Sequence, residues 1–436
     1  MEKKEAFKIE GRGGEKALKG TISISGSKNE SLGLLTSSLL FEGPVSFSNI
    51  PEISDIRALR LLLESVGAVT EQKGGNITIT PPKKMGTNLD AALARKFRAS
   101  VMLIGPLLSR EGVVTFPPPG GCLIGKRPID IFLSGFEKMG AKVEMSKDAA
   151  SFHITAPEGG LRGARIVFRV QSVTGTQTLL MAATLAKGTT TLVNVALEPE
   201  VTDLALFLKS CGAKIEGIGT PTLIVEGRDG KLLVQNGNSH HAISDRIEAG
   251  SYVVLGALCA ETLTITDCTP EHLELPLEML REAGVSFLVH TTSIEIHGNT
   301  RPNKEYKPLT LRTHEYPGFP TDLQAPFGIF ATQATGESVI EEMIFEGRLS
   351  YLHDLAQMGA VVDIAHPHKS IVRGPSKLLG RELYTPDLRA GLAYIIAAIV
   401  GKGTSYIHDI HYIDRGYERV EEKLRGVGVA IERITL

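Results

Sequence analysis

The sequence predicts an α/β (α+β) protein of two domains, built from six repeats of helix and strand with three repeats in each domain. Three observations lead to this fold class. The chain has 436 residues, which is more than one ordinary hydrophobic core accommodates. A helix that ends in glycine and continues into an alternating strand recurs six times, about every 72 residues. A second series of six apolar helices lies between these copies.

The first series is defined by six glycines that each follow an amphipathic helix. We predict that each glycine takes the left-handed αL conformation that ends a helix and turns the chain into a strand. The amphipathic helices should lie on the outside of each domain. The six copies are LLLESVGAVTE at Gly67, FEKMGAKVEM at Gly140, LFLKSCGAKIEG at Gly212, EMLREAGVSFL at Gly284, DLAQMGAVVDI at Gly359 and EKLRGVGVAIERI at Gly428.

The second series consists of helices that are apolar on nearly every side, so they should be buried. The longest apolar run, residues 390–400, is too short to span a bilayer. A solenoid is disfavoured because its repeats are normally shorter. The six helices contain SLGLLTSSLL, SVMLIGPLLS, TLLMAATLA, SYVVLGALCA, QAPFGIFATQA and AGLAYIIAAIV.

Three repeats in each half place the domain break within residues 227–245, a stretch rich in Gly, Asn and Ser. From the repeat count alone, the N-terminal strand at about residues 5–25 could belong to either half. We expect one domain to span residues 25–241 and the other to combine residues 1–24 with 242–436. The first would carry Lys28 and the Cys122 loop, and the second would carry Asp322, Arg389 and Arg415.

The charge balance and the cysteines exclude several classes of protein. The formal net charge of −2 gives no global basic field for nucleic acid or an anionic membrane. The first residues, MEKKEAFKIEGRGG, contain no apolar signal region, so we expect a cytoplasmic protein. The four cysteines form no C-x-x-C pair, so neither a zinc site nor a disulfide framework is expected. Cys211, Cys259 and Cys268 lie in apolar contexts that predict core positions, whereas Cys122 lies among Gly, Lys and Arg.

Cys122 is the best candidate for a reactive group. It lies in PPPGGCLIGKRPID, next to Lys126 and Arg127 and just before a helix that Pro128 should begin. These neighbours predict a lowered thiol pKa and a nucleophile or proton donor, with a small turn residue as the alternative. Residues 120–126 match G-x-x-x-x-G-K, but Arg127 stands where a P-loop needs Ser or Thr, which excludes a nucleoside triphosphatase.

The histidine pairs do not predict a metal site. His240 and His241, like His366 and His368, lie in polar loops, and an H-x-x-H pair ends at His411. No carboxylate pattern accompanies them, so surface histidines are the favoured interpretation. The chain also has no G-x-S-x-G nucleophile elbow.

Charged residues gather in the turns that precede the buried helices. If the repeats are alike, these helix N-termini point the same way within each domain, and two facing domains would direct them into one cleft. Such a cleft favours a phosphate-bearing ligand. Taken singly, each residue has a simpler interpretation, and Asp322 and Asp387 in particular could be helix caps. The residues are Lys28, Asn29, Lys96, Arg98, Asp245, Arg246, Asp322, Asp387 and Arg389, with Arg348 and Arg415 at other turns.

Nine motifs spread over essentially the whole chain resemble the enolpyruvyl transferase family, in particular the UDP-N-acetylglucosamine 1-carboxyvinyltransferases. They are ISGSKN, FRAS, PGGCLIGKRPID, EPEVTD, DRIEAG, FPTDLQA, FEGR, DLRA and IDRGYERVEEKL. The resemblance implies a two-domain inside-out α/β barrel of six βαβαββ-type units. It also implies transfer of an enolpyruvyl group from phosphoenolpyruvate to the 3′-hydroxyl of UDP-N-acetylglucosamine with release of phosphate. This would open peptidoglycan precursor synthesis, without a cofactor or metal, and would be a target of fosfomycin.

The resemblance also assigns roles to residues. Cys122 would protonate the enol carbon and Asp322 would accept the proton of the sugar hydroxyl. Phosphoenolpyruvate would be held by Lys28, Arg127 and Arg415, with Arg348 and Arg389 in the same anion site, and Asn29 would orient the substrates. The predicted contacts of UDP-N-acetylglucosamine are Arg98, Arg127, Pro128, Ile129, Asp130, Ile131, Ser172, Val173, Asp322 and Ile344.

Four positions depart from the family pattern on the nucleotide side: Glu52, Ser54, Phe132 and Val170. Two rival functions remain open. One is that of a 3-phosphoshikimate 1-carboxyvinyltransferase, which shares the repeat but lacks the loop cysteine. The other is that of a non-catalytic paralogue that only binds a UDP-sugar.

Overall fold

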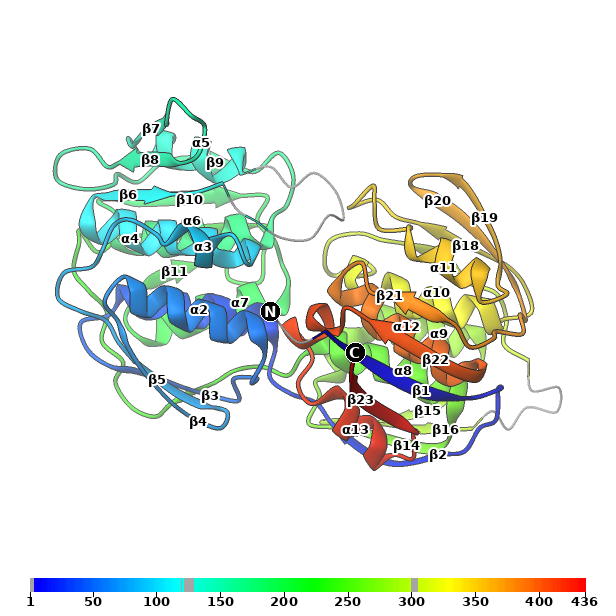
Figure 1. The fold of residues 1–436 in the computed structure, drawn as a ribbon. Helices are drawn as coiled ribbons and strands as arrows, with labels where there is room; N and C mark the ends of the chain where they lie inside the picture. Colours follow the sequence, from blue (N-terminus) through cyan, green and yellow to red (C-terminus); the bar gives the residue numbers. More distant parts are fainter. Residues whose placement is uncertain (1–3, 119, 121–128, 299–304) are drawn as a thin grey trace. The chain divides into compact units, whose positions relative to one another are not determined.

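The computed structural model describes residues 4–118, 120, 129–298 and 305–436. The chain divides into two compact units (Figure 1). Unit 1 combines Met1–Ser25 with Ser244–Leu436, and unit 2 combines Gly26–Cys122 with Arg127–Ile243. The described chain therefore passes between the units twice, once after Ser25 and once after Ile243.

One βαβαββ repeat generates the sheets of both units. In the third repeat of unit 2, β9 (Arg165–Val167) pairs in parallel with β10 (Thr189–Val193), β10 pairs antiparallel with β12 (Thr222–Glu226), and β12 pairs antiparallel with β11 (Lys214–Glu216). The same sequence of one parallel and two antiparallel pairings occurs in five four-stranded sheets of the described chain. The sixth sheet has three strands and the two antiparallel pairings. In place of the parallel pairing it has a single parallel bridge between Asn88 and Thr115. The predicted repeat is confirmed.

Unit 2 holds three repeats, with sheet orders β13-β3-β5-β4, β6-β8-β7 and β11-β12-β10-β9. Its elements are α1 (Lys28–Ser37), η1 (Ser38–Leu40), β3 (Val45–Ser48), α2 (Ser54–Ser65), β4 (Val69–Lys73), β5 (Asn76–Thr80), α3 (Ala91–Ala94), η2 (Arg98–Leu103), α4 (Ile104–Glu111), β6 (Val113–Phe116), α5 (Asp130–Lys138), β7 (Lys142–Met145), β8 (Phe152–Thr155), β9 (Arg165–Val167), α6 (Val173–Leu185), β10 (Thr189–Val193), α7 (Pro199–Ser210), β11 (Lys214–Glu216), β12 (Thr222–Glu226) and β13 (His240–His241).

Unit 1 holds the other three repeats, with sheet orders β15-β16-β14-β2, β17-β18-β20-β19 and β21-β22-β1-β23. Its elements are β1 (Glu5–Arg12), β2 (Leu18–Ser23), α8 (Arg246–Cys259), β14 (Ala260–Thr266), η3 (Pro270–Leu273), α9 (Glu274–Ala283), β15 (Ser286–Val289), β16 (Ser293–His297), β17 (Thr310–Arg312), η4 (Thr321–Leu323), α10 (Gln324–Gln333), β18 (Gly336–Glu341), α11 (Tyr351–Gln357), β19 (Val361–His366), β20 (Lys369–Gly374), β21 (Glu382–Tyr384), α12 (Leu388–Val400), β22 (Lys402–His408), η5 (Ile410–Arg415), α13 (Val420–Gly426) and β23 (Ile431–Thr435).

The first helix of each repeat is buried, as predicted. All thirteen residues of α12 are buried, and α8, α10 and α12 contact one another. The amphipathic α9 buries one face only. Because these helices lie inside and the sheets lie around them, each unit is an inside-out α/β barrel (Figure 1). Each unit has its own apolar core.

All six predicted glycines are in the left-handed region, with φ between 90° and 108°. At Gly67 the N–H donates to the Glu64 carbonyl at 2.9 Å, and the next N–H, of Ala68, donates to the Leu63 carbonyl at 3.1 Å. This pair of hydrogen bonds ends the helix in a Schellman motif, and the same pair recurs at the other five glycines. The sequence prediction of these six helix ends is confirmed.

Two further predictions concern buried residues. Cys211, Cys259 and Cys268 are buried, free thiols, as expected. Burial raises the pKa of Cys259 to about 12 and that of Cys268 to about 11, so neither is a thiolate at neutral pH. None of the described helices combines the length and the apolar character needed to cross a membrane.

Candidate functional site

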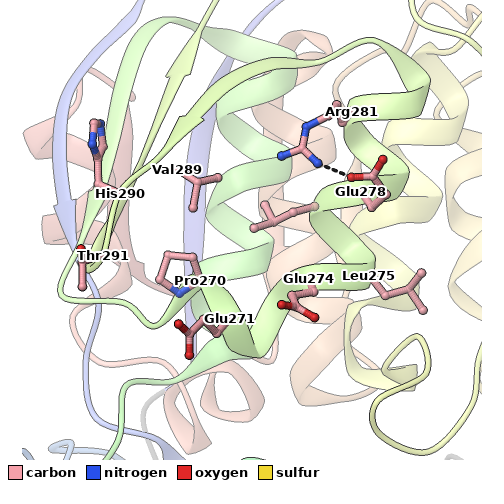
Figure 2. Close-up of a pocket in the computed structure, with 10 residues that line it drawn as sticks. Pro270, Glu271, Glu274, Leu275, Glu278, Arg281, Val289, His290 and Thr291 are labelled. Atoms are coloured by element: carbon pink, nitrogen blue, oxygen red, sulfur yellow. Dashed lines mark hydrogen bonds and ion pairs between the residues drawn. The ribbon is translucent and has the colours of Figure 1, made fainter.

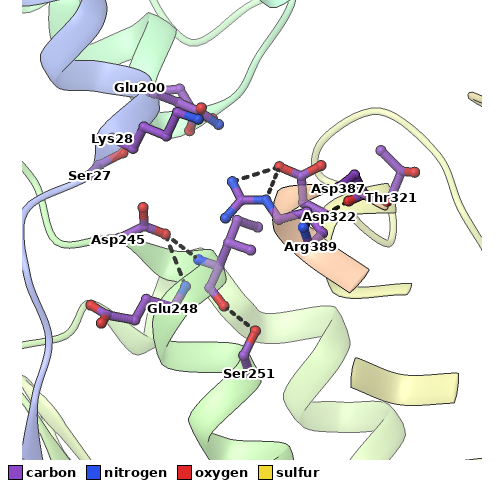
Figure 3. Close-up of polar contacts among 12 residues, drawn as sticks. Ser27, Lys28, Glu200, Asp245, Glu248, Ser251, Thr321, Asp322, Asp387 and Arg389 are labelled. Atoms are coloured by element: carbon purple, nitrogen blue, oxygen red, sulfur yellow. Dashed lines mark hydrogen bonds and ion pairs between the residues drawn. The ribbon is translucent and has the colours of Figure 1, made fainter. Parts of the chain in front are cut away.

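Two of the predicted acidic residues cap buried helices. Asp245 Oδ1 accepts a hydrogen bond from Ile247 N at 2.9 Å and so begins α8, as Figure 3 shows. Asp387 Oδ1 likewise accepts from Arg389 N at 2.8 Å and begins α12. Asp387 is therefore a cap, which is the simpler alternative that its sequence context left open.

Asp322 does not cap a helix, and the cap alternative is wrong for this residue. It lies in η4, whose N-cap is Pro320. Its Oδ1 lies 2.8 Å from Arg348 Nη1, and its Oδ2 lies 2.8 Å from Arg389 Nη2 and 2.9 Å from Arg389 Nε. Figure 3 shows the Arg389 guanidinium directed at this carboxylate. One carboxylate thus faces two guanidiniums, and the trio carries one net positive charge.

A hydrogen-bonded network holds Arg348 in place. Arg348 Nη1 donates to Thr321 Oγ1 at 2.8 Å, and Thr321 Oγ1 donates to Glu342 Oε2 at 2.8 Å. The other oxygen of the fully buried Glu342 accepts from Thr313 Oγ1 at 3.0 Å and from Ile344 N at 2.9 Å. Ile344, a predicted substrate contact, therefore contributes its backbone to the support of Arg348.

The charges of this trio fix its protonation. Burial alone would raise the pKa of Asp322, but Arg389 and Arg348 together lower it well below the usual range of a carboxyl group. Burial opposes the charge of Arg389, yet Asp322 raises its pKa above that of an ordinary guanidinium. Arg389 Nη1 also donates to the buried Tyr417 hydroxyl at 3.0 Å, and burial raises the pKa of Tyr417 to about 12. At neutral pH the site is a carboxylate, two guanidiniums and a phenol.

In unit 2 the predicted residues Lys28 and Asn29 begin α1. Lys28 Nζ lies 2.7 Å from Asp55 Oδ2, and the two side chains are only 10% and 7% exposed. Asn29 Nδ2 donates to Glu200 Oε1 at 3.5 Å. Burial makes this lysine a positioned charge at the N-terminus of a buried helix, where anions are favoured.

The remaining described site residues lie at the starts and ends of helices. Arg98 begins η2, Ile129 is the N-cap of α5 with Asp130 and Ile131 as its first residues, Ser172 is the N-cap of α6 with Val173 next, and Arg415 ends η5. Cys122, Arg127 and Pro128 lie outside the described residues.

The departures from the family pattern fall in different environments. Phe132 is 1% exposed and belongs to the core of unit 2, so it is a packing residue. Val170 is 59% exposed. Glu52 is exposed, and Ser54 is the first residue of α2.

A depression of about 620 Å³ in unit 1 contains none of the predicted site residues (Figure 2). It lies along α9 and the β15–β16 turn, where Glu271, Glu274 and Glu278 supply carboxylates. The one arginine there, Arg281, is paired with Glu278. Its acidic lining disfavours a phosphate-bearing substrate.

One cluster was missed by the sequence analysis. Glu30, Asp203 and His240 of unit 2 each place one candidate ligand atom within 4.8 Å of the others, and His240 Nε2 lies 2.7 Å from Asp203 Oδ2. The three residues are far apart in the sequence, so no local motif marks them. The local pattern around Glu30 is the S-x-x-E of Ser27 and Glu30, which is typical of a capping box at a helix start and does not indicate a cluster with Asp203 and His240.

Comparisons with known proteins agree with this architecture. A family model described as EPSP synthase (3-phosphoshikimate 1-carboxyvinyltransferase) matches residues 13–424. The chain is 40% identical over 422 residues to the UDP-N-acetylglucosamine 1-carboxyvinyltransferase of a Nitratiruptor species, which covers 97% of this chain and 98% of that relative. The chain belongs to the enolpyruvyl transferase family.

Two further members of the enolpyruvyl transferase family extend the comparison. The UDP-N-acetylglucosamine 1-carboxyvinyltransferase of Helicobacter hepaticus is 41% identical over 418 residues, covering 96% of this chain and 97% of the relative. The solved structure of the enolpyruvyl transferase NikO from Streptomyces tendae is 24% identical, with a TM-score of 0.88 over 100% of both chains. The latter shows the fold alone. The chain is thus an enzyme of the carboxyvinyl-transferring class.

Proposed function

We propose that this enolpyruvyl transferase uses UDP-N-acetylglucosamine as the acceptor and phosphoenolpyruvate as the donor, and so opens peptidoglycan precursor synthesis. The observation that carries the proposal is the pair of guanidiniums on Asp322, in a chain about 40% identical along its length to enzymes of that name. The sequence departs from the shikimate-type pattern at the loop of Cys122. Free buried thiols at the other cysteines support action in the cytoplasm.

The proposed reaction is an addition followed by an elimination. The 3′-hydroxyl oxygen of the sugar bonds to C2 of phosphoenolpyruvate while C3 gains a proton, which gives a tetrahedral ketal that still carries the phosphate. Loss of phosphate from C2 and of a proton from C3 restores the double bond. Each positioned acid or base contributes about 10²–10⁴-fold to the rate, and fixed cations stabilise the phosphate as charge develops.

The residues would divide these tasks. Lys28, Arg348, Arg389 and Arg415 would hold the anionic groups, and Cys122 stays the predicted proton donor to C3. Asp322 would accept the proton of the sugar hydroxyl. Held by two guanidiniums, Asp322 is a weak base, because its pKa lies far below its usual range. A substrate phosphate or carboxylate that bonds to these guanidiniums competes with Asp322, which raises the pKa of Asp322 toward that of a working base.

Phosphate release tests the acceptor directly. The full-length enzyme should release phosphate from phosphoenolpyruvate with UDP-N-acetylglucosamine and not with shikimate 3-phosphate. Release with shikimate 3-phosphate alone would assign the enzyme to the sibling reaction, and release with neither would indicate a binding protein.

The role of Asp322 has its own test. Asp322→Asn should lower kcat by about 10²–10⁴-fold, as expected for loss of a general base, with a much smaller change in KM. Asp363→Asn, an exposed aspartate of β19, is the matched control and should leave kcat unchanged. A defect of Asp322→Asn confined to KM would remove its role as the base.

Covalent labelling tests Cys122. A thiol-directed epoxide such as fosfomycin should label the enzyme once, and Cys122→Ser should abolish the label. The high pKa values of Cys259 and Cys268 keep these thiols unreactive near neutral pH. Label that persists in Cys122→Ser would point to another thiol.

A further inference from the structure

The cluster of Glu30, Asp203 and His240 joins three elements of unit 2. Glu30 is the third residue of α1, Asp203 lies in α7, and His240 begins β13. His240 Nε2 and Asp203 Oδ2 lie 2.7 Å apart, and the His240 ring packs against the Phe207 ring with centroids 4.7 Å apart. The imidazole is therefore held in place from one side by an aromatic ring and from another by a carboxylate.

Glu30 directs an unpartnered atom into this cluster. The residue is fully buried, and its Oε2 accepts a hydrogen bond from Ile243 N at 2.6 Å. Its Oε1 is buried and makes no hydrogen bond of ordinary geometry, although the Asp203 carboxyl group lies close enough to raise the pKa of Glu30. In a capping box, the Glu30 carboxylate would accept a hydrogen bond from Ser27 N. Here Ser27 N donates to the Ile243 carbonyl at 2.7 Å instead. A buried carboxylate oxygen without a partner is costly, so this atom calls for a proton or a cation.

The donor set selects the kind of cation. Two carboxylates and one neutral imidazole carry two negative charges, which a divalent ion neutralises. An imidazole ligand disfavours Mg²⁺ and Ca²⁺ and suits Zn²⁺ and its first-row neighbours. Ligand atoms about 2.0–2.2 Å from a tetrahedral Zn²⁺ lie roughly 3.3–3.6 Å from one another. The cluster spans at most 4.8 Å, and its closest pair is 2.7 Å apart, so shifts of about an ångström at the side-chain ends would complete the site.

We propose that Glu30, Asp203 and His240 bind one divalent transition-metal ion, with Zn²⁺ as the best fit. The ion takes one oxygen from each carboxylate and Nε2 of His240, and water completes the tetrahedron. Within the described residues, this is the one group of three such ligands that come this close together. The ion links α1, α7 and β13 next to Ile243, two residues along α1 from Lys28. Burial and the neighbouring Asp203 raise the pKa of Glu30, so a proton competes with the ion for this carboxylate.

Metal titration of the full-length, metal-free protein tests the site without using activity, so its result is independent of the proposed reaction. Co²⁺ should bind at one equivalent and give the visible absorption of a four-coordinate ion, and Zn²⁺ should displace it and raise the Tm. Binding should release protons, which calorimetry in two buffers of different ionisation enthalpy measures.

Three variants decide the assignment. Glu30→Gln and His240→Ala should each weaken Co²⁺ binding at least tenfold, and Asp203→Asn provides a second test of the carboxylates if Glu30→Gln fails to fold. His241→Ala, which removes the exposed neighbouring histidine, is the matched control and should bind as the natural chain does. Binding that survives all three ligand variants would overturn the proposal. So would a natural chain that takes up no Co²⁺ or Zn²⁺, because the cluster would then only share a proton.

Discussion

Helices α1 and α8 each follow one of the two passages of the chain between the units, and each has a buried glutamate as its third residue. Glu30 Oε2 accepts from Ile243 N at 2.6 Å, and Glu248 Oε2 accepts from Ser25 N at 2.9 Å. Glu30 thus contacts Ile243, the last residue of unit 2 before the chain passes to unit 1. Glu248 contacts Ser25, the last residue of unit 1 before the chain passes to unit 2. Beyond this shared contact, the two helix starts differ in how the charge is compensated.

Glu248 has a complete set of partners, because Lys423 Nζ lies 2.7 Å from its Oε1. Among the described residues, Glu30 pairs with no lysine or arginine and instead faces Asp203 and His240. The same backbone contact therefore occurs once beside a closed ion pair and once within the cluster for which we propose a cation. In both helices one oxygen of the glutamate accepts a backbone hydrogen bond, and the two glutamates differ in the partner of the other oxygen.

Removal of the Glu248 partner should have the largest effect on stability. Lys423→Met leaves Glu248, whose side chain is 2% exposed, as a buried carboxylate without its cation, and should lower the free energy of unfolding by about 3–5 kcal/mol. Urea denaturation measures this. The double variant with Glu248→Gln should recover much of the loss, and a loss of similar size in the double variant would show that packing of the lysine chain matters more than its charge.

The first residues of the two helices, Lys28 and Arg246, are also cations, and Lys28 is the one that we propose holds the anionic substrate. Lys28→Met should lower kcat/KM by about 10²–10³-fold, as for loss of one fixed donor to a developing anion. The variant also leaves the buried Asp55 without this partner, so Asp55→Asn is added in a second variant. We expect Lys28→Met with Asp55→Asn to regain stability and to remain slow. Recovery of activity there would assign Lys28 a purely structural role.

Substitution of Glu30 should have the smallest effect on stability. Glu30→Gln keeps an oxygen for Ile243 N, so at low pH it should change the free energy of unfolding by no more than the roughly 0.5–1.5 kcal/mol of one hydrogen bond. Glu248→Gln, which breaks an ion pair with Lys423, should cost more. Equal losses in the two variants would contradict the difference between the two helix starts.

The pH dependence of stability sharpens this contrast. Burial first, then Asp203 and Glu200, raise the pKa of Glu30 above its ordinary value of 4.5, while the bond from Ile243 N lowers it. The folded metal-free protein therefore holds this proton more tightly than the unfolded chain. Its contribution is fully present below pH 4.5 and is lost as the pH rises through the raised pKa. Denaturation of the metal-free protein at several pH values should show this loss, and Glu30→Gln should lack it even though Asp203 and His240 remain.

Local features of the fold could be predicted, and contacts between distant segments could not. Gly67 and its five counterparts were predicted because a Schellman motif depends on a few consecutive residues. Asp387 and Asp322 both looked like caps, and only the fold shows that Asp322 bonds instead to Arg348 and Arg389. The family resemblance placed those residues in one site but said nothing of Glu30 with Asp203 and His240. Their proximity arises from the packing of α1, α7 and β13.

The N-terminal strand β1 has a consequence for biosynthesis. It pairs with β22 and β23, and Leu436 N donates to the Lys4 carbonyl at 2.8 Å, so the first and last strands of the chain share one sheet (Figure 1). All residues of unit 2 follow β1 in the sequence and precede β22 and β23. Strand β1 of unit 1 is therefore made before unit 2, whereas its two partner strands are made after it. Until β22 and β23 have been synthesised, both edges of β1 lack these partner strands, and an unpaired strand edge is prone to pair with other chains.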